Sequence, residues 1–409
     1  MTTVLLVLPV QTYRAHAFLT AARCAGLEVV VAADEPSSLL PFMADRYVTL
    51  DLGRPEDAAA RAAELAARRR VDAVVGVDET AVLTAAAIAE RLGVRHHPLA
   101  AVRATRDKRL MRARLAASGV AQPAFRASST AASIAELEAV IGELGAPVVV
   151  KPVDLAASRG VIRADDVGTL VAAAGRIGAM LDADPHCGGG PWPLVIERFA
   201  AGPEVAVEGL VEDGVLRVLA ILDKPDPLDG PFFEETLFVT PSRHPAALLT
   251  EIGAVTAAAV ASIGLSEGPV HAELRLGDGV RVVEVAARSI GGLCSASLVF
   301  AAGCTLEEVI LRRACGMAMP DLTAGPGARG VLMLPTRSAG ILAGVDGRDG
   351  ALAIDGVDDV VISIPPGERL VPLPEGDRYL GFVTAHAADA AAAEAALRGA
   401  QRELHVRLR

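Results

Sequence analysis

Apolar runs of strand length alternate with helical patterns through the first hundred residues of the chain. Three of these runs are rich in Val, Leu and Ala: TVLLVLP (3–9), LEVVVAAD (27–34) and DAVVGV (72–77). The segments between them repeat apolar residues at helical spacing, as in PEDAAARAAELAARRR (55–70). Buried strands that alternate with helices are typical of a doubly wound parallel sheet. The pattern therefore predicts an α/β domain over residues 1–98, without the GxGxxG motif of dinucleotide binding.

Beyond residue 98 the pattern changes to a mixture of helices and antiparallel strands. A helix is predicted within TRDKRLMRARLAASGVAQP (105–123), where Asp107 can cap the first turn and Gly119 ends the helix. Residues 203–224 form two strand patterns joined by Asp-Gly, a hairpin signal. Residues 326–409 indicate strands followed by a closing helix. These segments predict an α+β architecture for the rest of the chain.

A pair of acidic residues lies in two strand patterns that flank Asp278-Gly279. This dipeptide is a strong signal for a two-residue turn, and pairing the strands outward from it places Glu273 opposite Glu284. Their Cβ atoms would lie about 4.5–5.5 Å apart, so the two carboxylates would repel each other. A divalent cation between them removes that repulsion, and Mg²⁺ prefers a few carboxylates together with phosphate oxygens. The alternative is a solvent-exposed hairpin with cross-strand Glu–Arg pairs.

Three cations lie where an anion would be bound. Lys108 lies near the start of a predicted helix, and Lys151 lies inside the apolar strand pattern VVVKP. A lysine in a buried strand is costly unless it meets an anion such as a phosphate. Arg288 follows Glu284 by four residues and so falls on the same face of the strand. The alternatives are a solvated helix residue for Lys108 and an edge-strand position for Lys151.

A small-residue loop and two further acids complete the set of candidate site residues. ASRGV (157–161) supplies a hydroxyl, a cation and a glycine, and such a loop can fold backbone N–H groups over phosphates. Glu197 ends a strand pattern, where its carboxylate could accept a hydrogen bond from an amine or a sugar hydroxyl. Glu204 begins the next strand pattern. A surface turn and solvent-facing acids are the alternatives.

Composition narrows the choice of partners. The net charge of −11 and the 3% aromatic content disfavour nucleic-acid binding, which needs basic patches and stacking platforms. Ala and Val account for the high apolar content, and no uninterrupted apolar run reaches about 18 residues, so no membrane span is expected. The N-terminus has no basic segment of a signal peptide, and five Cys without CxxC spacing fit a reduced, cytoplasmic protein.

The order of these motifs resembles that of the ATP-grasp superfamily. The resemblance covers roughly residues 100–320 and rests on a helix Lys, the VVVKP Lys, the small-residue loop, an ER before GPE, and two late acids followed by Arg. HAELRL and VVEVAARSIGG look most like the carboxylate–amine (L-amino-acid or dipeptide) ligase branch. The implied fold is a Rossmann-like domain (1–98), an ATP-grasp core (99–325, with a lid over about 125–196) and a C-terminal α+β domain (326–409).

The resemblance also implies a role for each motif residue. Mg²⁺, or Mn²⁺ as the alternative cation, would be bound by Glu273 and Glu284. Arg288 and Lys151 would act on the transferred phosphoryl group. ATP would be held by Lys108, Lys151, Ser158, Arg159, Gly160, Glu197, Phe199 and Glu204. Many members of the superfamily carry Asn two residues after the second acid, where this chain has Ala286, which leaves the number of metal ions open.

The expected reaction joins a small-molecule carboxylate to an amine through an acyl-phosphate at the expense of ATP. Phosphoryl transfer depends mainly on positioning and charge neutralisation, and the chain has no obvious hydrolase triad. The Pro-rich segment 223–245 is predicted to line the substrate side of the cleft. Substrate contacts are expected from Glu235, Arg243, Arg288, Gly291 and Gly292.

Two other functions remain open at this stage. A biotin-dependent carboxylase subunit would share the fold and act on bicarbonate, although the chain has no biotin-carrier lysine motif. A nucleotide-binding regulatory protein without ligase chemistry is the third hypothesis, and its best support is Ala286 in place of the Asn that many superfamily members carry. A homodimer is compatible with each of them.

Overall fold

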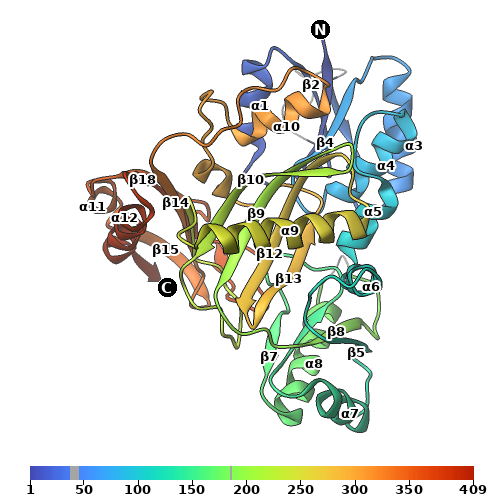
Figure 1. Cartoon of the computed structure of the whole chain (residues 1–409), viewed down its shortest axis with the longest axis vertical. Helices are drawn as coiled ribbons and strands as arrows, with labels where there is room; N and C mark the ends of the chain where they lie inside the picture. The colour runs from blue at the N-terminus through green and yellow to red at the C-terminus, as the bar shows by residue number, and fades with distance from the viewer. Residues whose placement is uncertain (37–45, 185–186) are drawn as a thin grey trace.

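A parallel four-stranded sheet forms the N-terminal part of the computed structural model, which describes residues 1–36, 46–184 and 187–409 (Figure 1). The strand order is β3–β2–β1–β4, and every pair is parallel. The predicted apolar runs form its longer strands: β1 (Thr3–Val7), β2 (Glu28–Ala33) and β4 (Ala73–Gly76), with β3 (Tyr47–Thr49) at one edge. Three helices connect these strands or follow them: α1 (Ala15–Cys24), α3 (Pro55–Ala66) and α4 (Val82–Leu92). The predicted doubly wound α/β domain is therefore confirmed.

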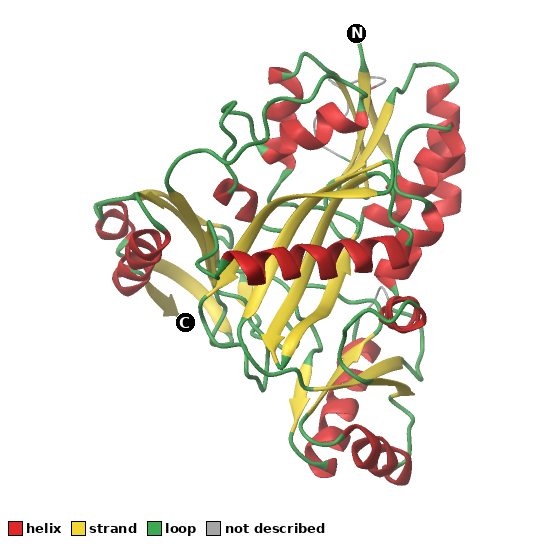
Figure 2. Cartoon of the chain, viewed as in Figure 1, coloured by secondary structure: helices red, strands yellow, loops and turns green. Residues whose placement is uncertain are grey.

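An eight-stranded antiparallel sheet occupies the centre of the molecule (Figure 2). Its order is β13–β12–β9–β10–β11–β14–β18–β16. The strands are β9 (Glu204–Glu212), β10 (Val215–Lys224), β11 (Leu237–Thr240), β12 (Gly268–Gly277), β13 (Gly279–Ala286), β14 (Ala328–Leu334), β16 (Val357–Ile362) and β18 (Gly381–Ala387). Because β14, β16 and β18 belong to this sheet, hydrogen bonds continue across residue 326, where the sequence predicts a domain boundary.

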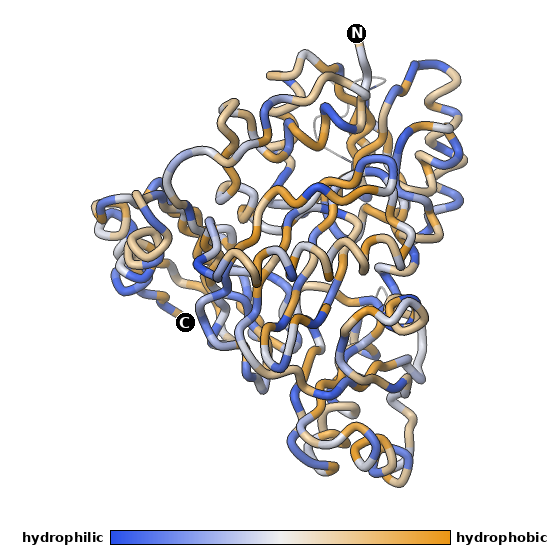
Figure 3. Tube along the Cα trace, in the orientation of Figure 1, coloured by the Kyte–Doolittle hydropathy of each residue, from blue (hydrophilic) through white to orange (hydrophobic). Residues whose placement is uncertain are grey.

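The helix α9 (Ala246–Ile263) crosses one face of the central sheet (Figures 1 and 2). Among the helices of the described residues, α9 is the one that is long and apolar enough to cross a membrane. It has 18 residues, and Glu251 is the one charged residue among them. Its buried side, which includes Ile252 and Val260, packs in an apolar core with residues of the sheet. Apolar positions recur along the helix and along the strands beneath it (Figure 3). Its apolar composition is thus partly explained by packing on the sheet.

A smaller antiparallel sheet lies at the opposite end of the molecule from the N-terminus (Figure 1). It has the order β5–β8–β6–β7 and falls within the predicted lid. Its elements are β5 (Phe125–Ser129), α7 (Ile134–Leu144), β6 (Val148–Pro152), β7 (Ile162–Ala164), α8 (Val167–Asp182) and β8 (Pro193–Arg198). The strands and the two helices bury an apolar cluster of their own.

The remaining elements connect these sheets or close the C-terminus. Asp107 caps α6 as predicted, because its side chain accepts hydrogen bonds from the backbone N–H groups of Arg109 and Leu110. A third small sheet has the order β17–β15–β19. The elements are α5 (Leu99–Arg106), α6 (Lys108–Ala117), η2 (Cys294–Ser297), α10 (Leu306–Ala314), β15 (Gly340–Asp346), α11 (Arg348–Leu352), β17 (Arg369–Leu370), α12 (Ala390–Glu403) and β19 (His405–Leu408).

Candidate active site

A cavity of about 90 Å³ lies between the lid sheet and the central sheet. Its walls come from α6, β6, β8, β9, β12 and β13 and from the segments that follow β6 and β10. Most of the residues predicted from the sequence line this cavity: Lys108, Lys151, Ser158, Glu197, Phe199, Glu204, Glu235, Glu273 and Glu284. These positions are separated along the chain by up to 176 residues (284 − 108), so the tertiary fold brings them together.

The two acids of the late hairpin are paired directly, as the sequence predicts. Glu273 on β12 is the ladder partner of Glu284 on β13. The predicted turn is wrong, however, because Gly277 pairs with Gly279 rather than with Val280. A bulge on β13 between Glu273 and Leu274 of the partner strand restores the register by one residue. The exposed-hairpin alternative does not hold for these side chains, whose exposed fractions are 20% and 29%.

Glu273 belongs to a cluster of three carboxylates that the sequence analysis did not anticipate. Oxygen atoms of Glu204, Glu235 and Glu273 all lie within 4.8 Å of one another. The ammonium of Lys224 lies among them, 2.6 Å from Glu204 and 3.1 Å from Glu273, and it also contacts Glu235. Burial raises the pKa of Glu235 to about 7 against the opposing effect of Lys224. The sequence assigns Glu235 to the substrate, but the structure places it beside the predicted metal ligand Glu273.

Lys224 was not predicted as a site residue, because it lies at the end of a strand pattern and belongs to no recognised motif. Its strand β10 is internal to the sheet, and its side chain is 3% exposed. The ammonium also lies 5.2 Å from the centre of the Phe238 ring. The nearby carboxylates raise the pKa of Lys224 although burial alone would lower it. A lysine at the end of a strand that enters a long Pro-rich segment was the available signal.

The two predicted lysines come from α6 and from β6 of the lid, and both are almost fully buried. The Nζ of Lys108 donates to the carbonyl of Leu155 at 2.6 Å and lies 3.7 Å from Glu284. The Nζ of Lys151 lies 2.9 Å from a carboxylate oxygen of Glu197. Because β6 lies between β8 and β7, the edge-strand alternative for Lys151 is wrong. Burial lowers the pKa of Lys151, which is the expected cost of this position.

Glu197 has partners other than the nucleotide base that the sequence predicts for it. One of its oxygens accepts from Nε of Arg112 at 2.7 Å, and the other accepts from Nη2 at 3.0 Å and contacts Lys151. Although burial opposes it, Arg112 and Lys151 lower the pKa of Glu197 to about 2. Arg112 also donates to the carbonyls of Val282 and Val283 on β13. Glu197 therefore positions Lys151, and Arg112 ties both to the hairpin.

Glu204 likewise has protein partners where the sequence predicts a sugar hydroxyl. Its oxygens lie 2.6 Å from Lys224 and 2.6 Å from Nε of Arg275. Arg275 in turn donates to the carbonyls of Gly202 and Leu228, and Leu228 lines the cavity. Glu204 thus joins the acidic cluster to an apolar wall.

The apolar wall is made by a small cluster separate from the main cores. Val149, Leu228 and Phe233 are buried together, and Val161 and Phe199 pack against them. Phe199 was predicted as a nucleotide contact, and it does line the cavity. The cavity is therefore apolar at one end and charged at the other, which suits a ligand with a planar ring and an anionic tail.

The small-residue loop after β6 reaches the cavity with one of its predicted residues. Ser158 lines the cavity, and both Ala157 and Ser158 have left-handed backbone conformations, with φ of 54° and 56°. Non-glycine residues adopt this conformation at an energetic cost, so two such residues in succession mark a strained backbone beside the cavity. The backbone strain is consistent with a loop shaped for a ligand.

The other two loop residues contact the C-terminal part of the chain instead. Arg159 pairs with Asp184 at 2.8 Å and donates to the carbonyl of Glu375 at 3.2 Å. The backbone N–H of Gly160 donates to the carbonyl of Pro374 at 2.9 Å. Arg159 and Gly160 do not line the cavity but connect the loop to residues 374–375, so their phosphate contacts stay a prediction.

Arg288 follows β13 and is held by an acid of the N-terminal sheet. It forms an ion pair with Glu79, and its Nη1 donates to the carbonyl of Ser289 at 2.9 Å. Glu79 also pairs with Arg106 at 2.7 Å. Although burial opposes it, Arg288 and Arg106 lower the pKa of Glu79 to about 2. Glu79 was not predicted as a site residue, because it lies three residues after β4 in a segment without a motif.

Arg243 is not brought to the cavity. It pairs with Asp223 at 3.1 Å and with Glu394 on α12 at 2.8 Å, and its side chain is 42% exposed. Arg243 and both of its partners lie outside the cavity lining, which gives no support to the predicted substrate contact. Arg243 joins the segment after β11 to the C-terminal helix.

The two predicted glycines differ in what their backbone requires. Gly292 has φ of +59°, and a Cβ there would lie 2.7 Å from the Phe382 ring, so the position excludes other residues. A Cβ at Gly291 would meet no atom of the described chain within 4 Å. Neither glycine lines the cavity, so their expected contact with the acyl-phosphate stays a prediction.

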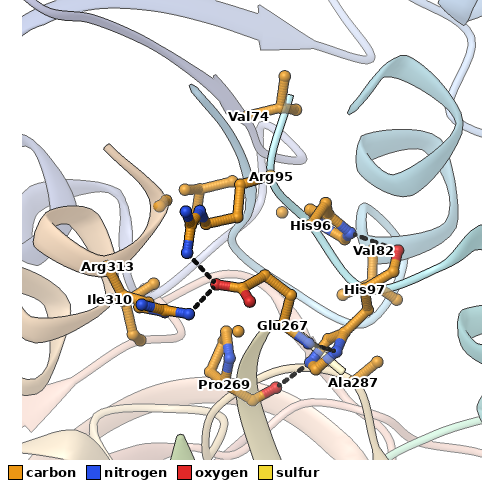
Figure 4. A pocket seen from close by; sticks show the side chains of 14 residues that line it. Val74, Val82, Arg95, His96, His97, Glu267, Pro269, Ala287, Ile310 and Arg313 are labelled. Carbon is orange, nitrogen blue, oxygen red and sulfur yellow. Dashed lines mark hydrogen bonds and ion pairs between the residues drawn. The ribbon is translucent and has the colours of Figure 1, made fainter. Parts of the chain in front are cut away.

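A second, smaller cavity of about 30 Å³ lies where the N-terminal sheet meets β12 and α10 (Figure 4). Glu267 pairs there with Arg95 at 3.2 Å and with Arg313 at 2.6 Å. His97 accepts a hydrogen bond from the Glu267 N–H at Nδ1, and its Nε2 lies 3.1 Å from the carbonyl of Pro269. Burial lowers the pKa of His97 to about 3. This cavity holds none of the predicted site residues, and its charges join the two parts of the molecule.

Comparison with known proteins agrees with this architecture. Family models match residues 19–94 (ATP-grasp N-terminal domain), 144–297 (ATP-grasp domain) and 332–409 (L-amino acid ligase C-terminal domain 2). The fold and the grouped lysines and carboxylates define an ATP-grasp protein, and the chain belongs to that superfamily. Within it, residues 332–409 match an L-amino acid ligase domain, and the relatives below are named as ligases of amino acids.

Several relatives are similar along much of the chain. The crystal structure of an L-amino acid ligase from Bacillus licheniformis superposes with a TM-score of 0.85 at 26% identity, covering 100% of this chain and 99% of that one. Alanine–anticapsin ligase from Bacillus subtilis is 27% identical over 62% of this chain. D-alanine–D-alanine ligase from Gloeobacter violaceus is 29% identical over 50% of this chain and 67% of its own length. The chain spans 56% of the alanine–anticapsin ligase.

Proposed function

We propose that the protein is an ATP-dependent carboxylate–amine ligase that forms an amide bond between amino-acid substrates through an acyl-phosphate. The observation that carries this proposal is the single cavity that unites Lys108, Lys151 and the paired acids Glu273 and Glu284. Similarity to ligases named for alanine, D-alanine and L-amino acids supports amino-acid substrates. The substrates are thus small molecules, and the protein would act in the cytoplasm.

The nucleotide would lie along the cavity from its apolar to its charged end. The base would pack against Val149, Phe199 and Phe233, and the phosphates would reach Lys108 and Lys151. Both ammonium groups are buried, so their attraction to phosphate is weakly screened by water. The backbone around Ser158 would add N–H donors to the phosphates.

The paired acids fit a divalent cation. Glu273 and Glu284 supply oxygen ligands on one side of a strand pair. Lys224 and Lys108 lie 3.1 Å and 3.7 Å from them, and a divalent cation would offset the remaining repulsion between the two acids when phosphates are bound. When bound, Mg²⁺ would neutralise charge on the phosphates during transfer. Ala286 is buried and offers no ligand atom, so the hairpin itself supplies two acidic ligands.

Arg288 would contribute the remaining positive charge on the substrate side. It lies four residues after Glu284, and its guanidinium is paired with Glu79. A guanidinium held by an acid from another part of the chain has little freedom left to lose when an anion binds. We propose that it contacts the transferred phosphoryl group.

The two other functions receive less support. Biotin carboxylase from Campylobacter jejuni superposes with a TM-score of 0.69 at 16% identity, which reflects the fold alone. The match of residues 332–409 to an L-amino acid ligase domain favours the ligase. A regulatory protein without chemistry would have no need to keep buried Lys108, Lys151 and the paired acids together, given their desolvation cost.

Phosphate release measured over a panel of amino-acid pairs tests the proposal. We expect release that needs ATP, Mg²⁺ and two amino acids together, and loss of at least about 100-fold in Glu284→Gln, since charge neutralisation carries most of the rate. Glu251→Gln on the outer side of α9 is the matched control and should keep the full rate. Release that depends on bicarbonate would instead support the carboxylase, and ATP binding without any release would contradict both enzyme functions.

A further inference from the structure

The segment after β13 is fastened from several sides by groups that the ligase chemistry does not explain. Besides the Arg288–Glu79 pair, the backbone N–H of Ile290 donates to buried Glu208 at 3.1 Å. Ser289, which lies between them, is 2% exposed. Its hydroxyl accepts a hydrogen bond from Nη1 of Arg14 at 2.7 Å. Three consecutive residues are thus held by three different parts of the chain.

Arg14 comes from the opposite end of the sequence, immediately before α1. Its side chain is 1% exposed, and its Nη2 pairs with Glu307 on α10 at 2.7 Å. The guanidinium also lies 5.0 Å from the centre of the Phe18 ring. One buried cation therefore joins the N-terminal sheet, α10 and Ser289.

Stability does not account for this arrangement well. Taking an arginine and a glutamate out of water costs about as much as their mutual attraction returns. The Nε of Arg14 is buried and has no hydrogen-bond partner in the part of the chain that the structure describes, which adds a further cost. An apolar residue would fill this site more favourably, so the specific placement of Ser289 is the better explanation.

Arg14 and Glu79 lie in the segments that follow two neighbouring strands of the N-terminal sheet. Arg14 follows β1 and Glu79 follows β4, and the two strands are parallel neighbours. The helices after them, α1 and α4, pack in different apolar clusters and so cover opposite faces of the sheet. The carboxyl ends of such diverging strands leave a crevice that commonly receives a ligand. Here residues 288 and 289 are held at this crevice by one acid and one base.

We propose that Arg14 is a positioning residue that fixes Ser289, and through it Arg288 and the backbone of residues 290–292, for the amino-acid substrates. The nucleotide end of the cavity has no direct contact with Arg14, so the effect should be confined to the substrate end. This inference rests on the proposed ligase function. It assigns part of the substrate site to the N-terminal sheet.

Steady-state kinetics of two variants test the proposal. Ser289→Ala removes the accepted hydrogen bond, and Arg14→Lys keeps the charge but loses the two-pronged contact. We expect kcat/KM for the amino acids to fall about 10- to 100-fold in both variants, while KM for ATP stays within about twofold, because small displacements of reacting groups are costly. Ser297→Ala is the matched control, since its hydroxyl is equally buried and bonds to the carbonyl of Cys294.

Hydrogen–deuterium exchange separates a failure of this inference from a failure of the ligase proposal. The amide of Ile290 and its neighbours should exchange at least about tenfold faster in Ser289→Ala than in Ser297→Ala. This readout needs no turnover, so it decides the matter even if the wild-type protein proves inactive. Ser289→Ala kinetics or exchange no different from those of Ser297→Ala would overturn the proposal.

Discussion

At the scale of single residues, buried charges set the geometry of the cavity. Arg112 is 0% exposed, and it binds both oxygens of Glu197 and two carbonyls of β13. It joins the lid, which carries Lys151, to the hairpin, which carries the paired acids. Loss of one partner from such a network leaves the other buried and uncompensated.

Arg112→Met should lower the free energy of unfolding by about 3–5 kcal/mol, because Glu197 would lose its main counter-ion in a buried position. ATP binding should weaken as well, since Lys151 would then be the sole cation at Glu197. Urea denaturation and ATP titration measure the two effects. Arg126→Met, which breaks an exposed pair with Glu143, is the control and should cost less than about 1 kcal/mol. Equal losses in the two variants would contradict the role given to Arg112.

At the scale of elements, the hairpin of β12 and β13 is held in register by a loop that crosses its end. The carbonyl of Pro203 accepts from the Leu276 N–H at 2.8 Å, and Gly202 accepts from Arg275. A Cβ at Gly202 would lie 2.7 Å from the Gly277 Cα, so the two backbones approach closely. This crossing explains how an irregular turn and a bulge still give a fixed pairing of the acids.

Gly202→Ala should destabilise the protein by about 2–4 kcal/mol, because it adds a clash with Gly277 to the strain of φ +104°. Gly214→Ala is the matched control, since its φ is +81° and an added Cβ would meet no described atom within 4 Å. That control should cost about 1 kcal/mol. Thermal unfolding of both variants measures the difference, and similar midpoints would show that the crossing is looser than the structure indicates.

At the scale of the whole molecule, the junction around Glu267 joins the N-terminal sheet to the central sheet (Figure 4). His97 is neutral there, because its Nδ1 must accept a hydrogen bond from a backbone N–H. A proton on that nitrogen would face the N–H directly. The junction therefore depends on the protonation state of one buried ring.

Stability should fall as the pH drops below 6.5, the pKa of histidine in the unfolded chain, toward the folded pKa of about 3. The unfolded state binds the proton first, so the contribution of His97 is complete above pH 6.5 and decreases by about 2 kcal/mol at pH 5. Urea midpoints at pH 7 and pH 5 measure this loss. The loss should shrink in His97→Gln, whose amide does not titrate, and an unchanged pH dependence in that variant would contradict the prediction.

The prediction from sequence succeeded where a residue depends on its own strand or helix. Glu273 and Glu284 were placed opposite each other from a turn signal, although the turn itself was wrong and a bulge compensated for it. Lys151 was recognised because an ammonium in an apolar strand needs a partner. Four charged residues were missed, because their ion-pair or hydrogen-bond partners lie more than ten positions away in the sequence: Lys224, Arg112, Glu79 and Arg14.

The sequence by itself determined the parallel N-terminal sheet, the burial of Lys151 and the acidic hairpin, because hydrophobic period, turn residues and isolated charges are local properties. Only the tertiary structure decided which charges meet. It gave Glu197 and Glu204 to arginine and lysine partners, turned Arg159 and Arg243 toward the C-terminal part, and brought Arg14 to Ser289. The physical reason is that a buried charge takes the nearest opposite charge in space, and the packing of the sheets sets that distance.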